Sequence, residues 1–172
     1  MKRAHFTLAA ALTLVLLGGA VGLCAQELNS AAKAGADNKN GRAYSGMYTF
    51  LKEGEFVQVT VEDEGHVTGF ISRYGNGDSD KGAFLNQFFK TGKLDGNKLN
   101  FTTEIVHGVS FDFKGTVERG EGKNPSDEAY LVLRGILTEN TSDASKKVTS
   151  HTRDVLFKLF PQEAAPSEVM RK

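Results

Sequence analysis

The sequence has few of the residues that would point to a particular chemistry. Its 172 residues include one cysteine, no tryptophan and three prolines, and its formal net charge at pH 7 is zero. No basic stripe is present, which argues against nucleic acid or an anionic membrane as a partner. The sequence contains no nucleophile elbow, zinc-protease motif or cysteine nucleophile beyond its N-terminus. We therefore expect no cofactor and find no support for catalysis, although enzyme activity stays an open alternative.

The N-terminus has the three-part layout of a secretory signal. Two basic residues precede an apolar stretch at 6–21, and small residues follow near Ala25. The stretch is short for a membrane-spanning helix, which needs about 20 residues, and no second apolar run follows. We expect cleavage after Ala25, a secreted or periplasmic protein, and no integral membrane segment after cleavage. A lipoprotein attached through Cys24 is an alternative, but Leu23 fits a lipobox poorly. An uncleaved anchor is another.

Composition predicts one domain between two polar segments. After the signal peptide at 1–25, residues 26–43 are small and polar and are interpreted as a flexible leader. Residues 161–172 carry two prolines and are interpreted as a flexible tail. Residues 44–160 have the alternating texture of a β domain. Signal cleavage would remove the sole cysteine, so stability must come from the core rather than from a disulfide.

Eight strand-like segments follow one another within 44–160. Val57, Val59 and Val61 alternate with polar residues, and His107-Gly108 suits a type I′ hairpin. Because the connections are short, neighbouring strands should pair antiparallel. We predict an all-β, eight-stranded up-and-down β-barrel, with a two-sheet β-sandwich as the alternative. The predicted strands are 44–51, 56–62, 66–74, 84–94, 98–106, 109–118, 128–139 and 148–160, with no helical segment.

One stretch resembles the first three strands of avidin and streptavidin. Those begin with a Gly-x-aromatic strand and continue to a Gly-x-[Leu/Val]-Thr-Gly strand, matched here by Gly46-Met47-Tyr48 and Gly65–Gly69. The resemblance implies an eight-stranded barrel, for which a lipocalin-like barrel is an equally permissible comparison. Avidins enclose biotin with several tryptophans, and this chain has none. Their asparagine, serine and aspartate set for the biotin ureido group has no counterpart that we can place, so biotin binding is not implied.

Topology points to one end of the barrel as a candidate ligand site. The connections between strands 1–2, 3–4, 5–6 and 7–8 share that end and include two of the three long loops. On the last strand, a period of two places Val155, Phe157 and Leu159 inward and continues toward the mouth. An apolar cavity with a few polar groups at its entrance is the usual form of a small-molecule site. The predicted ligand-binding residues are Thr149, His151, Arg153, Phe101, Thr103, Phe111 and Phe113.

A polar loop has a weak likeness to a calcium site. Asn76, Asp78 and Asp80 place oxygen atoms at every second position, as at the start of a calcium loop. Lys81 opposes a cation, however, and Gln87 stands where the last acidic ligand is needed. We therefore interpret this segment as a solvated loop and predict no metal site.

Two consecutive aromatic residues raise the question of a partner surface. Phe88 and Phe89 are neighbours on a predicted strand, so one points inward and the other outward. An exposed phenylalanine suggests cover by a loop, by the leader or by another subunit. A homodimer is therefore one alternative.

The sequence favours a binding function without naming a ligand. The leading hypothesis is an exported β-barrel module that takes a small, partly apolar ligand into its mouth. One alternative is a structural or interaction protein of the cell envelope with a filled barrel. Another is a small lumen-type barrel enzyme, such as a cyclase or isomerase. All three share the fold, which does not fix the function.

Overall fold

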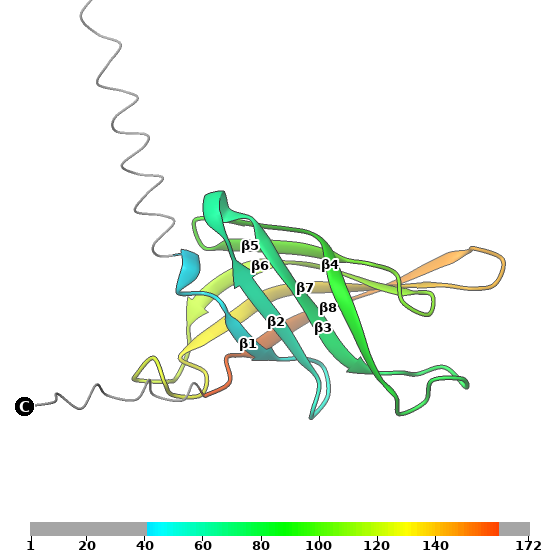
Figure 1. Cartoon of the computed structure of the whole chain (residues 1–172), viewed down its shortest axis with the longest axis horizontal. Coiled ribbons are helices and arrows are strands. Elements are labelled where there is room, and N and C mark those ends of the chain that lie inside the picture. The colour runs from blue at the N-terminus through cyan, green and yellow to red at the C-terminus, as the bar shows by residue number, and fades with distance from the viewer. Residues whose placement is uncertain (1–40, 162–172) are drawn as a thin grey trace, which may run out of the picture.

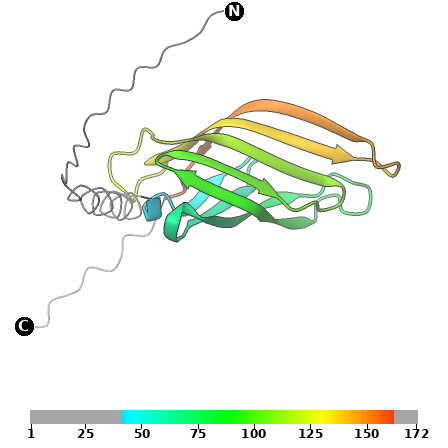
Figure 2. The ribbon, with the colours of Figure 1, turned by 90° about the horizontal axis from the view of Figure 1, so that it is seen from above.

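The computed structural model describes residues 41–161, which form one antiparallel eight-stranded sheet whose strands lie in chain order. The sheet curls into a barrel (Figures 1 and 2), the predicted up-and-down meander rather than a sandwich. No helix in this part of the chain is long and apolar enough to cross a membrane. The strands are β1 (Gly46–Thr49), β2 (Phe56–Val61), β3 (Val67–Tyr74), β4 (Phe84–Asp95), β5 (Lys98–Thr103), β6 (Val109–Arg119), β7 (Leu131–Ser142) and β8 (Val148–Lys158).

Several predictions concern residues outside the described range. The signal peptide at 1–25, its cleavage after Ala25 and the role of Cys24 belong to this group. So do most of the leader and the tail from residue 162. Residues 41–43 were assigned to the leader, but Gly41 is buried and its carbonyl accepts the Tyr44 amide at 3.0 Å.

Some strand boundaries differ from the prediction for local backbone reasons. β7 begins at Leu131 rather than at residue 128, because Ala129 adopts a positive φ of 54° and interrupts the extended chain. The prediction of no helical segment is wrong at η1 (Asp63–Gly65), a single 3-10 turn. The His66 amide closes this turn by donating to the Asp63 carbonyl at 3.1 Å.

β1 and β8 close the barrel only near the end of β8. Tyr48 bridges Leu159, and the Lys158 amide donates to Thr49 Oγ1 at 2.9 Å. β1 has four residues and cannot accompany the eleven residues of β8 along their whole length. The β7–β8 hairpin therefore projects beyond the barrel wall, to the right in Figure 1.

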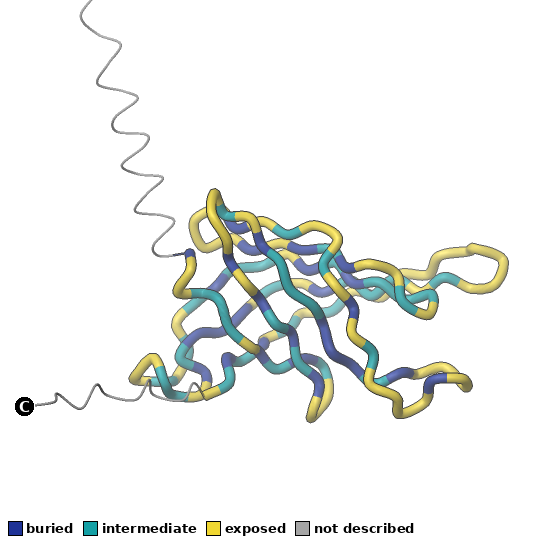
Figure 3. The backbone as a smooth tube through the Cα atoms, viewed as in Figure 1, coloured by how far each residue is buried: buried dark blue, intermediate teal, exposed yellow. Residues whose placement is uncertain are grey.

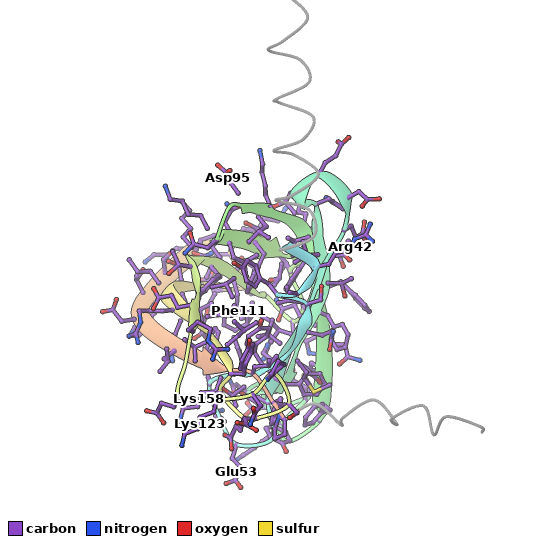
Figure 4. All side chains as sticks on the ribbon, turned by 90° about the vertical axis from the view of Figure 1, so that its left-hand side faces the viewer. Arg42, Glu53, Asp95, Phe111, Lys123 and Lys158 are labelled. Atoms are coloured by element: carbon purple, nitrogen blue, oxygen red, sulfur yellow. The ribbon has the colours of Figure 1, made fainter. Side chains whose placement is uncertain are left out.

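Aromatic side chains fill most of the interior. Phe89 stacks on Phe101 with ring centroids 4.2 Å apart, and Phe101 stacks on Phe113 at 5.2 Å. Phe88, by contrast, is 55% exposed, so the two neighbours face opposite sides as predicted. Buried and exposed positions alternate along the strands in Figure 3, and Figure 4 shows Phe111 inside the ring of strands. The barrel is thus largely a packed core.

Two facing glycines make room for this packing. Gly115 on β6 pairs with Gly135 on β7. A Cβ on Gly115 would lie 2.2 Å from the Arg134 carbonyl oxygen and 2.6 Å from the Phe113 ring. Glycine at this position therefore lets the Phe113 ring lie against the strand backbone, where a side chain would collide.

Candidate functional site

A cavity of about 350 Å³ lies at the end of the barrel predicted to be the mouth. Phe50 and Phe111 form its apolar floor, with their ring centroids 5.3 Å apart. Phe157 packs beneath, 5.2 Å from Phe50, so the cavity does not continue into the core at this point. The volume is at the lower end of the range for small-molecule sites. The lining consists of Phe50, Leu51, Lys52, Glu55, Arg73, Tyr74, Asn76, Phe111, Glu139 and Arg153.

A buried polar layer lies along one side of the cavity. Arg73 Nε donates to Gln87 Oε1 at 3.0 Å, and both side chains are almost completely buried. Gln87 Nε2 in turn donates to Thr103 Oγ1 at 3.1 Å and to the Val109 carbonyl at 2.6 Å. Side chains alternate between the two faces of β3 and β4, and this alternation turns Arg73 and Gln87 inward. There they meet acceptors at the end of β5 and the start of β6. Satisfied networks of this kind are rigid, so we interpret the layer as a fixed wall of the cavity.

The Arg73 guanidinium is surrounded by acidic groups. Burial lowers the pKa of Arg73 below its ordinary value, while the carboxylates of Glu139, Asp80 and Glu55 act in the opposite direction. Its terminal nitrogens donate to two backbone carbonyls at 3.2 and 3.4 Å. Arg73 therefore uses its hydrogen-bond donors within the protein, and the neighbouring carboxylates balance its charge.

Arg153 differs because one of its donors is unused. Arg153 Nη2 donates to Glu139 Oε2 at 2.6 Å, and the two side chains are 35% and 22% exposed. Arg153 Nε is buried without a hydrogen-bond partner, the sole side-chain nitrogen or oxygen in this condition within 41–161. Leaving a buried donor unpaired costs about 1–3 kcal/mol. Arg153 lines the cavity, and its buried Nε is a donor that no group in the described part of the chain uses.

The loop at 75–83 is held by a buried aspartate. Asp80 Oδ2 lies 2.7 Å from His107 Nδ1, and its Oδ1 accepts the Gly77 amide at 2.7 Å. The interpretation as a solvated loop is therefore wrong for Asp80, which ties this loop to the β5–β6 turn. His107 and Gly108 both have positive φ, at 51° and 75°, as a type I′ turn requires. Among the described residues, no three His, Cys, Asp or Glu side chains gather as a group that could hold a metal ion.

The structure separates the predicted ligand-binding residues into three groups. Arg153 and Phe111 line the cavity. Thr149 and His151 are exposed on the projecting β7–β8 hairpin. The third group is buried in the core below the cavity and consists of Phe101, Thr103 and Phe113. For all seven residues, contact with a ligand stays a prediction.

Sequence reasoning missed four polar residues of the mouth. Arg73 shares the inward phase of Ile71, and Glu139 shares that of Leu137, so the period of two contained this signal. A charged residue on an inward phase near a strand end is the pattern that could have found both. Glu55 is buried in a loop, where periodicity gives no guidance. Gln87 lies on the predicted strand 84–94, but sequence reasoning weighed it only as the last position of a calcium-like motif.

Comparison with known proteins identifies the fold. No protein-family model and no curated protein match the sequence. Among solved structures, rhizavidin is similar with a TM-score of 0.53 at 12% identity, over 73% of this chain and 88% of rhizavidin. The rhizavidin–biotin complex gives 0.50 at 13% identity, over 67% and 98%, and intact apo afifavidin gives 0.50 at 15%, over 79% and 97%. Together with the eight-stranded antiparallel meander, these similarities show that the chain has a distant avidin-like fold.

Proposed function

We propose that this protein binds a small, partly apolar molecule in the mouth cavity, and that the molecule presents an acidic group to Arg153. The observation that carries the proposal is the unpaired Nε of Arg153, a residue that lines a cavity of about 350 Å³. A carboxylate is the acceptor that fits a guanidinium best, because the two groups match in planar, two-bond geometry. Phe50 and Phe111 offer apolar surface for the rest of the molecule.

The hydrogen-bond partners around the cavity favour an anion over a cation. Three basic and two acidic side chains line it, and Asp80, which also acts on Arg73, brings the formal charge of the surroundings to zero. Both carboxylates already have partners: Glu139 accepts from Arg153, and Glu55 accepts the Lys52 and Tyr74 amides at 3.1 and 3.0 Å. A cation would have to compete with these donors for the two carboxylates. An anion would instead accept from a donor that is still unused and would leave these hydrogen bonds in place.

The avidin-like fold supports a small-ligand function but not a particular ligand. Rhizavidin has been solved in complex with biotin. In the present chain, Phe113 and Phe157 occupy the interior, and the sequence has no tryptophan. We therefore propose a ligand confined to the mouth, and we do not propose biotin.

Export is a separate proposal that rests on the N-terminal sequence pattern. We propose that the chain is cleaved after Ala25 and works in the periplasm or outside the cell. Mass spectrometry of the protein recovered from that compartment should give an N-terminus at Gln26. A recovered chain that retains residues 1–25 contradicts the proposal, and a lipid on Cys24 supports the lipoprotein alternative.

The packed interior favours one alternative function. Because aromatic side chains fill the barrel below the mouth, the chain also fits an interaction protein that uses its outer surface. Binding at the mouth distinguishes the two proposals, because an interaction protein with a filled barrel has no need of a small acidic ligand.

The binding proposal is tested by titration with matched probes. Protein purified from cells that express the full sequence is titrated with octanoate and benzoate, and with octanamide and benzamide as uncharged controls. We expect saturable binding of a carboxylate by calorimetry, about tenfold or more tighter than its amide. Biotin serves as a third probe, and native mass spectrometry of the purified protein searches for a captured molecule. Absence of saturable carboxylate binding together with no captured molecule contradicts the proposed function.

A further inference from the structure

A continuous aromatic surface covers the outside of β2, β3 and β4, on the opposite side of the barrel wall from the core. Ring centroids are 5.9 Å apart for Phe56–Phe70, 5.6 Å for Phe70–Phe88 and 4.7 Å for Tyr74–Phe84. Phe84 and Phe88 are 48% and 55% exposed. The strand register places Gln58, Phe70 and Phe88 in one row across the three strands. We call this surface the aromatic face and define it by Phe56, Phe70, Tyr74, Phe84 and Phe88, together with Met47 on the neighbouring β1.

The members of the aromatic face are uncharged, and the exposed charged residues Lys90 and Glu104 lie at its edge next to Phe88. The polar residues within it are neutral, and Ser72 Oγ donates to Asn86 Oδ1 at 2.9 Å at its centre. The outer wall of β5–β8 is different, because it carries basic and acidic side chains, including the Arg134–Glu118 pair at 3.1 Å. An uncharged surface can be buried without desolvating a charge. The aromatic face is thus the part of the outer wall best suited to burial.

We propose that the aromatic face packs against the same face of a second copy of this chain. A two-fold contact brings identical patches together, so any charge near the axis would meet its like. The aromatic face avoids this repulsion, and two sheet faces pack readily about 10 Å apart. This choice of partner rests on the proposed removal of residues 1–25, since the other segments outside the barrel, 26–40 and 162–172, contain only Leu28, Val169 and Met170 as large apolar residues.

The size of the aromatic face limits the proposed dimer to a weak one. A fully buried aromatic side chain removes about 150–250 Å² from water, and the exposed share of these six residues amounts to roughly 400 Å². One partner of a standard stable interface contributes about 800 Å². We therefore expect a dissociation constant in the micromolar range, with monomers at high dilution.

Sedimentation velocity over a concentration series tests the proposal. The wild-type protein is compared with F84T/F88T and with the matched control I136T/L156T, whose residues are 48% and 42% exposed on the outer wall of β7 and β8. We expect wild type and control to shift from monomer to dimer between about 1 and 500 μM. F84T/F88T should dimerise at least about tenfold more weakly. A monomeric wild type, an unchanged F84T/F88T or an equal loss in the control overturns the proposal.

A cross-link locates the contact independently. Asn86 lies at the centre of the aromatic face and is exposed, so in a two-fold contact it approaches its own copy. In a C24S background, N86C should form an intermolecular disulfide under mild oxidation, and R134C, on the opposite outer wall, should not. Cross-linking of N86C that does not exceed that of R134C contradicts the proposal. Circular dichroism verifies that every variant is folded.

Discussion

The lower and upper parts of the barrel interior are built from different chemistry. In the lower part, Phe101, Phe113 and Phe157 pack against one another and against buried aliphatic side chains, and water is excluded. Above, the Arg73–Gln87 layer and the Arg153–Glu139 pair place charged and amide groups inside the same wall. Apolar packing stabilises a fold in proportion to buried area, whereas buried polar groups contribute only when they are fully paired. The difference separates residues that maintain the barrel from residues available for binding.

The largest effect is expected where the lower part is densest. Phe113→Ala removes a ring that is 0% exposed and in contact with Phe101 and Phe157. The lost burial and the cavity left behind should lower the free energy of unfolding by about 3–5 kcal/mol, measured by urea denaturation. A loss below about 1 kcal/mol would show that the lower part is not the stabilising half.

Substitution in the polar layer should lower the stability nearly as much, for a different reason. Gln87→Leu removes the acceptor of Arg73 Nε and leaves that charged group buried with an unpaired donor. Thr103 Oγ1 and the Val109 carbonyl lose one donor each but keep the Phe111 and Val106 amides. We expect a loss of about 2–4 kcal/mol in urea denaturation. Asn100→Leu on the exposed side of β5 is the control and should change stability by about 0.5 kcal/mol or less. Equal effects of the two substitutions contradict a structural role for the layer.

Tyr48 gives a pH-dependent test of the lower part. Its hydroxyl donates to the Tyr44 carbonyl at 2.7 Å, and burial raises the pKa of Tyr48 above its ordinary value near 10. The unfolded chain therefore ionises first, and unfolding becomes easier as the pH rises above about 10. Tyr48→Phe should cost about 1 kcal/mol at pH 8 and show a smaller loss between pH 8 and 11 than wild type. Parallel pH profiles of the two proteins would contradict this assignment.

The smallest effect on stability is expected at the mouth. Arg153→Met removes a guanidinium that is partly exposed and has one unpaired buried donor, and Glu139 can regain water. We expect a change of about 1 kcal/mol or less in urea denaturation. A loss as large as that of Phe113→Ala would show that Arg153 serves the fold rather than a ligand.

Much of the fold could be predicted from local pattern. The alternation of Val57, Val59 and Val61 and the short turns specify neighbouring antiparallel strands, and the structure has all eight in that order. Strand ends were less predictable. The start of β7 depends on the positive φ of Ala129, a residue whose type does not indicate such a conformation.

The site was only partly predictable because its composition depends on contacts between distant strands. The period of two placed Arg153 on the inward face, and topology placed the mouth. The same period placed His151 there too, but β1 ends at Thr49, and the hairpin beyond it loses its partner strand and projects into solvent. Likewise, Arg73 and Gln87 have the appearance of surface residues until the register brings them together. The length of a partner strand and the pairing of polar groups are not local properties.

The affinity of Arg153 variants for octanoate tests the central proposal most directly. Calorimetric titrations compare wild type with Arg153→Met, with Arg153→Lys, and with Arg134→Met as the matched substitution on the outer wall, where Arg134 is 59% exposed. Lysine keeps the charge beside Glu139 but lacks the Nε donor. We predict at least about tenfold weaker binding for Arg153→Met, an intermediate loss for Arg153→Lys and no change for Arg134→Met. Octanoate binding that is saturable in wild type and equal in all three variants would contradict the assignment of the site to Arg153.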